Sequence, residues 1–446
     1  MKTYTNRTLR AALLVTLLAV SLLVTACSTP APEAPDVTTA PTRTARPTFT
    51  AVAQLDPTEL PTETATAQEA AAPTQEPPTA EPEATATPSE PEPTATTPMP
   101  AAKPLRMNSP EYGMQAFLWW RPEVASRDVQ IVRAAGFGWI KVNFGWREIE
   151  LAKGQFDWAH TDHIVEMANA EGLDLLVRID YQPRWAGGGY PVSGPPDNPQ
   201  DLADFLFALA SRYKGRIRAY QVWNEPNLAR EWGGKTPDPG AYVSLLQRCY
   251  AAIKRADPNA MVISAGLSPT GTWNAEARPD DWYLESMYVA MGGSSRGYFD
   301  VLGVHGAGFL SPPETDPAVV EANPSLGGHR SMAFRRVEDL RAIMVRYGDA
   351  DKQIALLEFG WTSDPRPDSP YHWHAVSEEV KADYLVRAYQ YAKANWSPWI
   401  GLMSLIYVSD PDWTPDHEQY WWAITDPGYP EFQPRAAYIA LKAMPK

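Results

Sequence analysis

Two short apolar runs, LDLLVRID (residues 173–180) and IRAYQVWNE (217–225), lie on either side of a longer amphipathic run, NPQDLADFLFALASRYKG (198–215). The short runs are typical of strands buried on both faces of a parallel sheet. Apolar residues three and four positions apart in the middle run predict a helix. The stretch therefore predicts a β-α-β unit, and its second strand ends unusually, in Asn224-Glu225-Pro226.

The same alternation recurs on both sides of this stretch, and we count eight strand-helix units. The predicted strands are 112–119, 137–145, 173–180, 217–225, 260–268, 299–306, 352–360 and 399–410. The predicted helices are 124–136, 159–172, 198–215, 239–258, 280–291, 329–348, 376–395 and 431–444. Eight such units in one domain predict a (β/α)₈ barrel (TIM barrel) over residues 105–446. A doubly wound open sheet is the alternative, but no GxGxxG motif follows the first strand.

The N-terminus has the features of an export signal. Lys2, Arg7 and Arg10 precede the apolar run AALLVTLLAVSLLVTA, and Cys27 follows at once. This arrangement resembles a bacterial lipoprotein signal over residues 1–26, which would place a lipid on Cys27 and anchor the chain to a membrane. We therefore expect an extracytoplasmic lipoprotein, at the cell surface or in the periplasm. An uncleaved signal anchor is the alternative.

Residues 27–104 are dominated by Pro, Thr, Ala and Glu, so they have too few apolar side chains to form a core and predict a disordered linker. The whole chain has 446 residues and a formal net charge of −14, which excludes a nucleic-acid partner. Its second cysteine, Cys249, lies in a helical pattern and is expected in the core. We expect a monomer that uses no cofactor.

In a barrel of this type, function collects at the C-terminal ends of the strands. Two strands of otherwise apolar residues end in a glutamate, the fourth at Glu225 and the seventh at Glu358. Two carboxylates facing each other can cleave an acetal if one has a raised pKa and protonates the leaving oxygen while the other attacks the anomeric carbon. The chain also has 17 tryptophans, many of them after predicted strand ends, which favours a carbohydrate substrate.

The runs VWNEPN and LLEFGW resemble the clan A glycoside hydrolases, most closely family 39 with its β-xylosidases and α-iduronidases, and also the family 5 cellulases. The resemblance implies that Glu225 is the general acid/base, Glu358 the nucleophile and Asn224 a donor to the sugar 2-hydroxyl, in a retaining mechanism. It also implies that His305 lines the sugar subsite beside the nucleophile. Ala307 departs from family 5, where a tyrosine is often found, so another group must orient Glu358.

Further polar and aromatic residues at the predicted strand ends are candidates for binding substrate. They are Asn143, Trp146, Arg178, Trp185, Trp361, Asp410 and Trp422. Trp421 is an equal candidate to its neighbour Trp422. His372 and His374 have a spacing that could bind a metal, but two ligands make no closed site, so no metal is expected.

The sequence thus predicts a hydrolase acting on O-glycosyl bonds of an oligo- or polysaccharide. A carbohydrate-binding lipoprotein without hydrolysis, serving transport or adhesion, is the alternative. The sugar, and the choice between chain ends and internal bonds, depend on loop shapes that the sequence does not define.

Overall fold

The computed structural model describes residues 103–119 and 121–446. The predicted signal at residues 1–26, Cys27 and all but the last two residues of the predicted linker lie outside the described residues, as does Trp120. No helix in the described part of the chain is long and apolar enough to cross a membrane.

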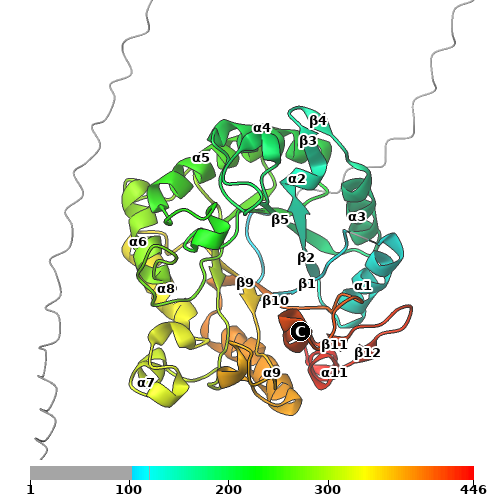
Figure 1. Cartoon of the computed structure of the whole chain (residues 1–446), viewed down its shortest axis with the longest axis vertical. Helices are drawn as coiled ribbons and strands as arrows, with labels where there is room; N and C mark the ends of the chain where they lie inside the picture. The colour runs from blue at the N-terminus through cyan, green and yellow to red at the C-terminus, as the bar shows by residue number, and fades with distance from the viewer. Residues whose placement is uncertain (1–102, 120) are drawn as a thin grey trace, which may run out of the picture. The chain divides into compact units, whose positions relative to one another are not determined.

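Eight parallel strands form a ring in the order β7-β6-β5-β2-β1-β10-β9-β8 (Figure 1). They are β1 (Glu111–Gln115), β2 (Trp139–Gly145), β5 (Asp174–Asp180), β6 (Ala219–Val222), β7 (Met261–Ser264), β8 (Leu302–His305), β9 (Ile354–Phe359) and β10 (Ile400–Leu405). A parallel bridge between Ile263 and Val301 joins the two ends of this order and closes the ring. The predicted (β/α)₈ barrel is confirmed.

Eight main helices surround the strands, one after each strand (Figure 1). They are α1 (Pro122–Ala134), α3 (Ala159–Ala170), α4 (Pro199–Arg212), α5 (Pro239–Ala256), α6 (Asp280–Ala290), α8 (Arg336–Arg346), α9 (Glu378–Asn395) and α11 (Ala436–Ala443). Side chains cap three of them, because Asn198, Asp238 and Ser377 accept hydrogen bonds from backbone N–H groups of the first helical turn. The predicted helix 329–348 starts later, at Arg336.

Short elements occupy the connections between these strands and helices. They are α2 (Trp146–Ile149), β3 (Glu150–Ala152), β4 (Gln155–Phe156), η1 (Arg184–Ala186), η2 (Ala229–Glu231), α7 (Pro317–Glu321), η3 (Pro324–Leu326), η4 (Arg330–Met332), η5 (His372–His374), α10 (Glu418–Trp422), β11 (Thr425–Asp426) and β12 (Gln433–Pro434). All of them follow the C-terminal end of a strand and precede the next main helix. The connections are therefore longest and most structured at one end of the barrel, which we call the mouth.

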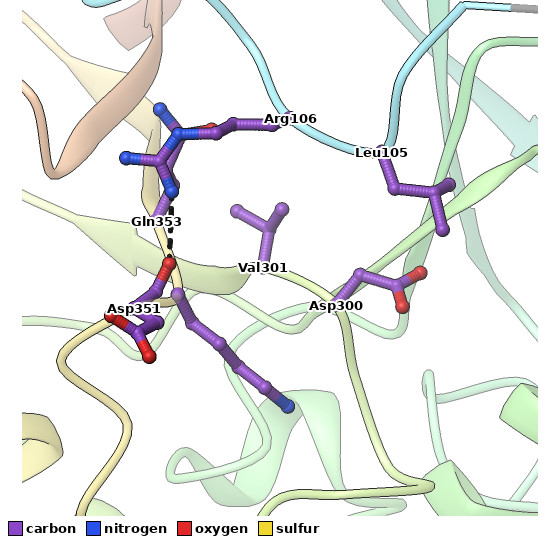
Figure 2. A pocket seen from close by; sticks show the side chains of 7 residues that line it. Leu105, Arg106, Asp300, Val301, Asp351 and Gln353 are labelled. Carbon is purple, nitrogen blue, oxygen red and sulfur yellow. Dashed lines mark hydrogen bonds between the residues drawn. The ribbon is translucent and has the colours of Figure 1, made fainter.

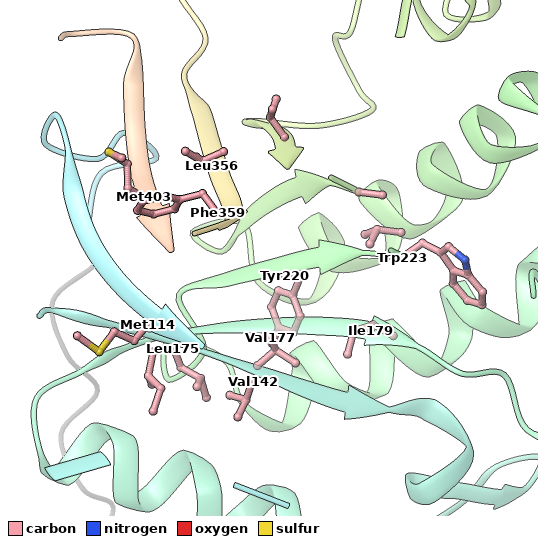
Figure 3. Packing of buried hydrophobic residues seen from close by; sticks show 14 of the residues in the cluster. Met114, Val142, Leu175, Val177, Ile179, Tyr220, Trp223, Leu356, Phe359 and Met403 are labelled. Carbon is pink, nitrogen blue, oxygen red and sulfur yellow. The ribbon is translucent and has the colours of Figure 1, made fainter. Parts of the chain in front are cut away.

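Two layers of apolar side chains hold the barrel together. The larger layer lies between strands and helices and includes Val142, Val177 and Phe359 (Figure 3). A smaller cluster, including Leu176 and Leu357, fills the barrel interior below the mouth. Cys249 is buried in the outer layer, as predicted, and has no disulfide partner among the residues described.

Candidate active site

The backbone turns sharply where strand β6 ends. Trp223 and Glu225 both have left-handed conformations, with φ of 72° and 37°, which is uncommon for residues other than glycine. The Glu225 N–H donates to the Gly266 carbonyl at 3.1 Å, and the Leu228 N–H donates back to the Glu225 carbonyl at 2.9 Å. Asn227 donates to the carbonyl of Ser268 and accepts from its N–H. These bonds fix Glu225 at the mouth, and strained backbone of this kind clusters at functional sites.

The Glu225 carboxyl group is held by two basic side chains. Its Oε1 lies 3.0 Å from Nδ1 of His305, and its Oε2 accepts a hydrogen bond from Arg230 at 3.0 Å. Burial alone would raise the pKa of this carboxyl, but the hydrogen bond and charge of His305, helped by Arg230, outweigh it and leave the pKa lowered. The raised pKa expected for a proton donor is therefore wrong for this arrangement of the side chains.

Glu358 lies on β9 in register with His305 of β8. Its Oε1 accepts a hydrogen bond from Nζ of Lys141 at 2.7 Å and another from Arg178 at 3.3 Å. Burial favours the neutral acid, but the charges of Lys141, His305 and Arg178 reverse that effect and hold the pKa of Glu358 far below its ordinary value. Glu358 is thus an ionised carboxylate at neutral pH.

His305 lies between the two glutamates. Its Nδ1 is 3.0 Å from Oε1 of Glu225 and 3.9 Å from Oε2 of Glu358, so these two oxygens are at most about 7 Å apart. The ring rests directly on Gly266, where a Cβ atom would come within 2.1 Å of it. Its Nε2 is buried and has no hydrogen-bond partner within the described part of the chain.

Lys141 is a functional candidate that the sequence reasoning missed. Its side chain is only 1% exposed, and burial lowers its pKa to about 8 against the opposing attraction of Glu358. The signal was present, because Lys141 stands inside the apolar run WIKVNFG two residues before Asn143. Alternation along β2 places both side chains on the same face of the strand.

Asn143 and Arg178 belong to the same buried network. Asn143 is in register with Arg178 of β5, and its side-chain amide donates to Asp180 at 2.7 Å. Arg178 forms ion pairs with Asp180 at 2.9 Å and with Glu358 at 3.3 Å. Burial raises the pKa of Asp180, although the Arg178 charge opposes that rise. Lys141 and Arg178 both donate to Oε1 of Glu358, so they are the groups that can orient this carboxylate where Ala307 replaces the family 5 tyrosine.

Other predicted site residues occupy different surroundings. Asn224 is nearly buried and lies 3.5 Å from the amide of Gln221. Trp422 is also nearly buried, and its indole donates to Glu418 at 3.2 Å. Asp410 forms an ion pair with Arg121 at 3.7 Å.

Two predicted substrate contacts are wrong. The indoles of Trp146 and Trp361 are fully buried, so neither has a face to offer a sugar. Trp146 packs nearly parallel to Phe205 and donates to Glu150 at 2.6 Å. Trp185 packs edge-on against the fully buried Trp146 and is itself partly buried. Trp146 and Trp361 belong to the outer layer of the barrel core, against which Trp185 packs.

A third carboxyl group lies near Glu225 and Asp180. Glu231, on η2, has its pKa raised to about 7, first by burial and then by the negative charges of Asp180 and Glu225. Tyr371, from the connection after β9, hydrogen-bonds to Glu418, and burial followed by the charge of Glu418 raises its pKa to about 12. Nothing in the sequence pattern distinguished Glu231 or Tyr371 from other loop residues.

Among residues 103–119 and 121–446 no group of three or more His, Cys, Asp or Glu could hold a metal ion. His374 packs among aromatic rings, and burial lowers its pKa to about 4. His372 is exposed and lies against the Asp364 carbonyl at 3.3 Å. The two histidines therefore face different surroundings.

A cavity of about 340 Å³ lies far from these glutamates, at the N-terminal ends of β8 and β9 (Figure 2). The chain entering the barrel forms part of its wall, and Arg106 donates to the Asp351 carbonyl there at 2.9 Å. The N-terminal face of such barrels serves stability rather than chemistry. This cavity is therefore separate from the candidate active site.

A sequence model described as cellulase (glycosyl hydrolase family 5) matches residues 101–289. No curated protein matches the chain significantly. Among solved structures, a family 39 glycoside hydrolase from the gut symbiont Bacteroides cellulosilyticus WH2 is 19% identical with a TM-score of 0.53, over 77% of this chain and 64% of that one. This chain thus spans less than two thirds of that protein's length.

Two further structures are similar. A glucosidase from Croceicoccus marinus is 14% identical with a TM-score of 0.54, over 76% of this chain and 68% of that one. The GH5_18 protein from Streptomyces cattleya, solved with GlcNAc, is 16% identical with a TM-score of 0.55, over 75% and 79%. The sequence match bears out the predicted resemblance to family 5, and the family 39 structure shares the barrel fold. The sequence match supports a glycoside hydrolase, and the structural similarities establish the shared barrel fold.

Proposed function

We propose that this protein is a retaining glycoside hydrolase that cleaves O-glycosidic bonds of an oligo- or polysaccharide. One observation carries the proposal. Glu225 and Glu358 meet at the mouth on either side of His305, and both are partly open to solvent, with side chains 12% and 17% exposed. Their closest oxygens lie within about 7 Å, which is compatible with the ~5–5.5 Å between carboxyl groups that retention requires.

Glu358 suits the role of nucleophile because Lys141 and Arg178 keep it ionised. Its free Oε2 would attack the anomeric carbon and form a glycosyl-enzyme while the bond to the leaving oxygen breaks. Glu225 would give its proton to that oxygen, and would later take a proton from the water that releases the sugar.

Glu225 must be protonated to act first as an acid, yet its pKa is lowered in the substrate-free protein. Arg230 accounts for part of this effect, and its side chain is 67% exposed, so it can move away when a sugar enters. Removing a cation from a buried carboxylate raises its pKa. Displacement of Arg230 by substrate would therefore raise the pKa of Glu225 toward the range that proton donation needs, while the larger effect of His305 remains. Asn224, next to Glu225 in the chain, would contact the sugar, as the resemblance implies.

The proposed location follows from the sequence: export, and a lipid on Cys27 that holds the enzyme at a membrane, with the segment 27–104 as a spacer. Expression in a bacterium with radiolabelled palmitate tests it. Label in the wild type and none in Cys27→Ala supports the anchor; label in neither chain contradicts it.

The activity is tested by screening residues 103–446 on 4-nitrophenyl glycosides and on polysaccharides, beside Glu358→Gln and Glu225→Gln. We expect Glu358→Gln to lose at least 10³-fold in kcat on every substrate. Glu225→Gln should lose far less on 4-nitrophenyl glycosides than on polysaccharides, because nitrophenolate leaves without protonation. Equal activity of the wild type and either variant would refute the assigned roles. Sugar binding without any turnover would favour a binding lipoprotein.

A further inference from the structure

The two exposed tryptophans in the described part of the chain both lie at the mouth. Trp373 is 46% exposed and lies on η5, in the connection after β9. Trp273 is 57% exposed and lies in the connection between β7 and α6. Most of the other described tryptophans are buried or pack against the core. Neither exposed indole has a part in the proposed cleavage.

Trp373 is held firmly although it is exposed. Its ring is stacked on Phe309 with 25° between the planes and 6.2 Å between the centroids, and the edge of His374 lies 4.8 Å away. Gly327 packs against its far end, where a Cβ would come within 3.1 Å of the ring. An aromatic ring supported on one face and open on the other is preorganised to stack on a flat ligand.

A short series of contacts links Trp373 to the glutamates. His374 touches the rings of Tyr371 and Trp422 at 5.9 Å each, and Tyr371 senses the charges of Arg230 and Glu225. Trp373 is therefore linked to the Glu225 side of the mouth through His374 and Tyr371.

Trp273 lies further along the same rim. Its ring stands edge-on to Trp282 at 4.6 Å, and Arg278 covers it at 5.1 Å. The β7 connection that carries it packs on the β8 connection, because Gly271 leaves room for His329 there. The β8 connection also holds Phe309 and Gly327, which contact Trp373, so this one connection touches the segments that carry both tryptophans.

We propose that Trp373 and Trp273 are sugar-stacking platforms that bind units of a neutral polysaccharide outside the position where cleavage occurs. The inference rests on the proposed function and deepens it, because it names a polymer as the substrate. Sugar rings present C–H bonds that match the negative faces of indoles. With a net charge of −14, the chain favours a neutral polymer over a polyanion.

Two measurements test the platforms in residues 103–446. The first is affinity electrophoresis in gels containing hydroxyethyl cellulose, xylan or glucomannan, which reports binding whether or not the polymer is cleaved. The second is kcat/KM on the retarding polymer and on a 4-nitrophenyl glycoside. The variants are Trp373→Ala, Trp273→Ala and the aromatic Trp373→Phe. Phe207→Ala is the control, because Phe207 is a similarly exposed aromatic residue on α4, outside the mouth.

We expect each alanine variant to reduce retardation and to lower kcat/KM on the polymer by roughly two- to tenfold, mainly through KM. Activity on the 4-nitrophenyl glycoside should not change. Trp373→Phe should recover part of the loss, and Phe207→Ala should match the wild type.

If the polymer gels retarded the wild type and both alanine variants equally, the proposal that the two tryptophans bind sugar would be refuted. A wild type that cleaves 4-nitrophenyl glycosides but is retarded by none of the polymers would refute it too, although the proposed activity would then stand. A wild type that is retarded through the tryptophans but cleaves nothing would support the platforms and refute the hydrolase.

Discussion

Replacing Lys141 with methionine tests how the protein keeps Glu358 ionised. Methionine has a similar length and no charge, so the variant removes the 2.7 Å hydrogen bond from Nζ to Glu358. The buried ammonium is itself costly. A pKa lowered from 10.5 to about 8 corresponds to roughly 3 kcal/mol against the charged form. We therefore expect Lys141→Met to fold, with little change in melting temperature.

Although the melting temperature should change little, the pKa of Glu358 should change clearly. A hydrogen bond to a charged group contributes about 1.5–3 kcal/mol, so its loss should raise the pKa of Glu358 by about one to two units. The pKa stays below its ordinary value because Arg178 and His305 remain. Since only the carboxylate attacks the sugar, the acid limb of activity moves to higher pH by the same amount.

The assay is kcat/KM on a 4-nitrophenyl glycoside from pH 9 down to pH 1.5, over the range in which circular dichroism shows the protein to be folded. This leaving group needs little protonation, so the acid limb reports Glu358 rather than Glu225. Lys381→Met is the matched control. Lys381 is also buried, pairs with Glu378 at 2.8 Å and has its pKa lowered by burial to about 8, but it does not contact Glu225 or Glu358. Its variant should keep the wild-type acid limb.

One result would refute this reasoning. If Lys141→Met lost activity by the same factor at every pH, with an unmoved acid limb, then Lys141 would shape the site without controlling the ionisation of Glu358.

Three further predictions concern neighbouring groups. Arg230→Gln should raise the pKa of Glu225, because a cation at 3.0 Å from its carboxyl group is lost. Since Arg230 is largely exposed, the alkaline limb of the kcat/KM profile on a glycoside with a poor leaving group should move up by only about 0.2–0.7 pH units. A downward move would contradict the role assigned to Glu225. Gly266→Ala should reduce kcat by at least tenfold, since its Cβ would meet the His305 ring at 2.1 Å, and an unaltered kcat would show that the ring can shift freely. Trp146→Ala should lower the free energy of unfolding by about 3–5 kcal/mol in urea titration, with KM little changed if the protein is assayed while folded. If Trp146→Ala instead kept the wild-type free energy of unfolding and showed a large rise in KM, Trp146 would contact the sugar after all.

Local sequence patterns predicted the barrel well, because each of its strands and helices is marked by its own periodicity. The run LDLLVRID became β5, and 217–225 became β6, although that strand stops at Val222 where the backbone turns. Such turns come from hydrogen bonds with other connections, so strand ends were predicted less well than strand centres. Glu225 and Glu358 were found because a carboxylate at the end of an apolar run is unusual wherever the chain later folds.

The surroundings of those carboxylates depended on contacts between residues far apart in the chain. Lys141 reaches Glu358 across 217 positions of sequence, and His305 reaches Glu225 across 80. The tryptophans also show what local sequence cannot predict. Trp146 and Trp373 both follow strands, yet Trp146 is buried and Trp373 is exposed. The sequence by itself determined the barrel and the two glutamates, through local periodicity and residue type. Only the tertiary structure decided their ionisation and which tryptophans face solvent, because charge and burial are set by neighbours that the chain brings together on folding.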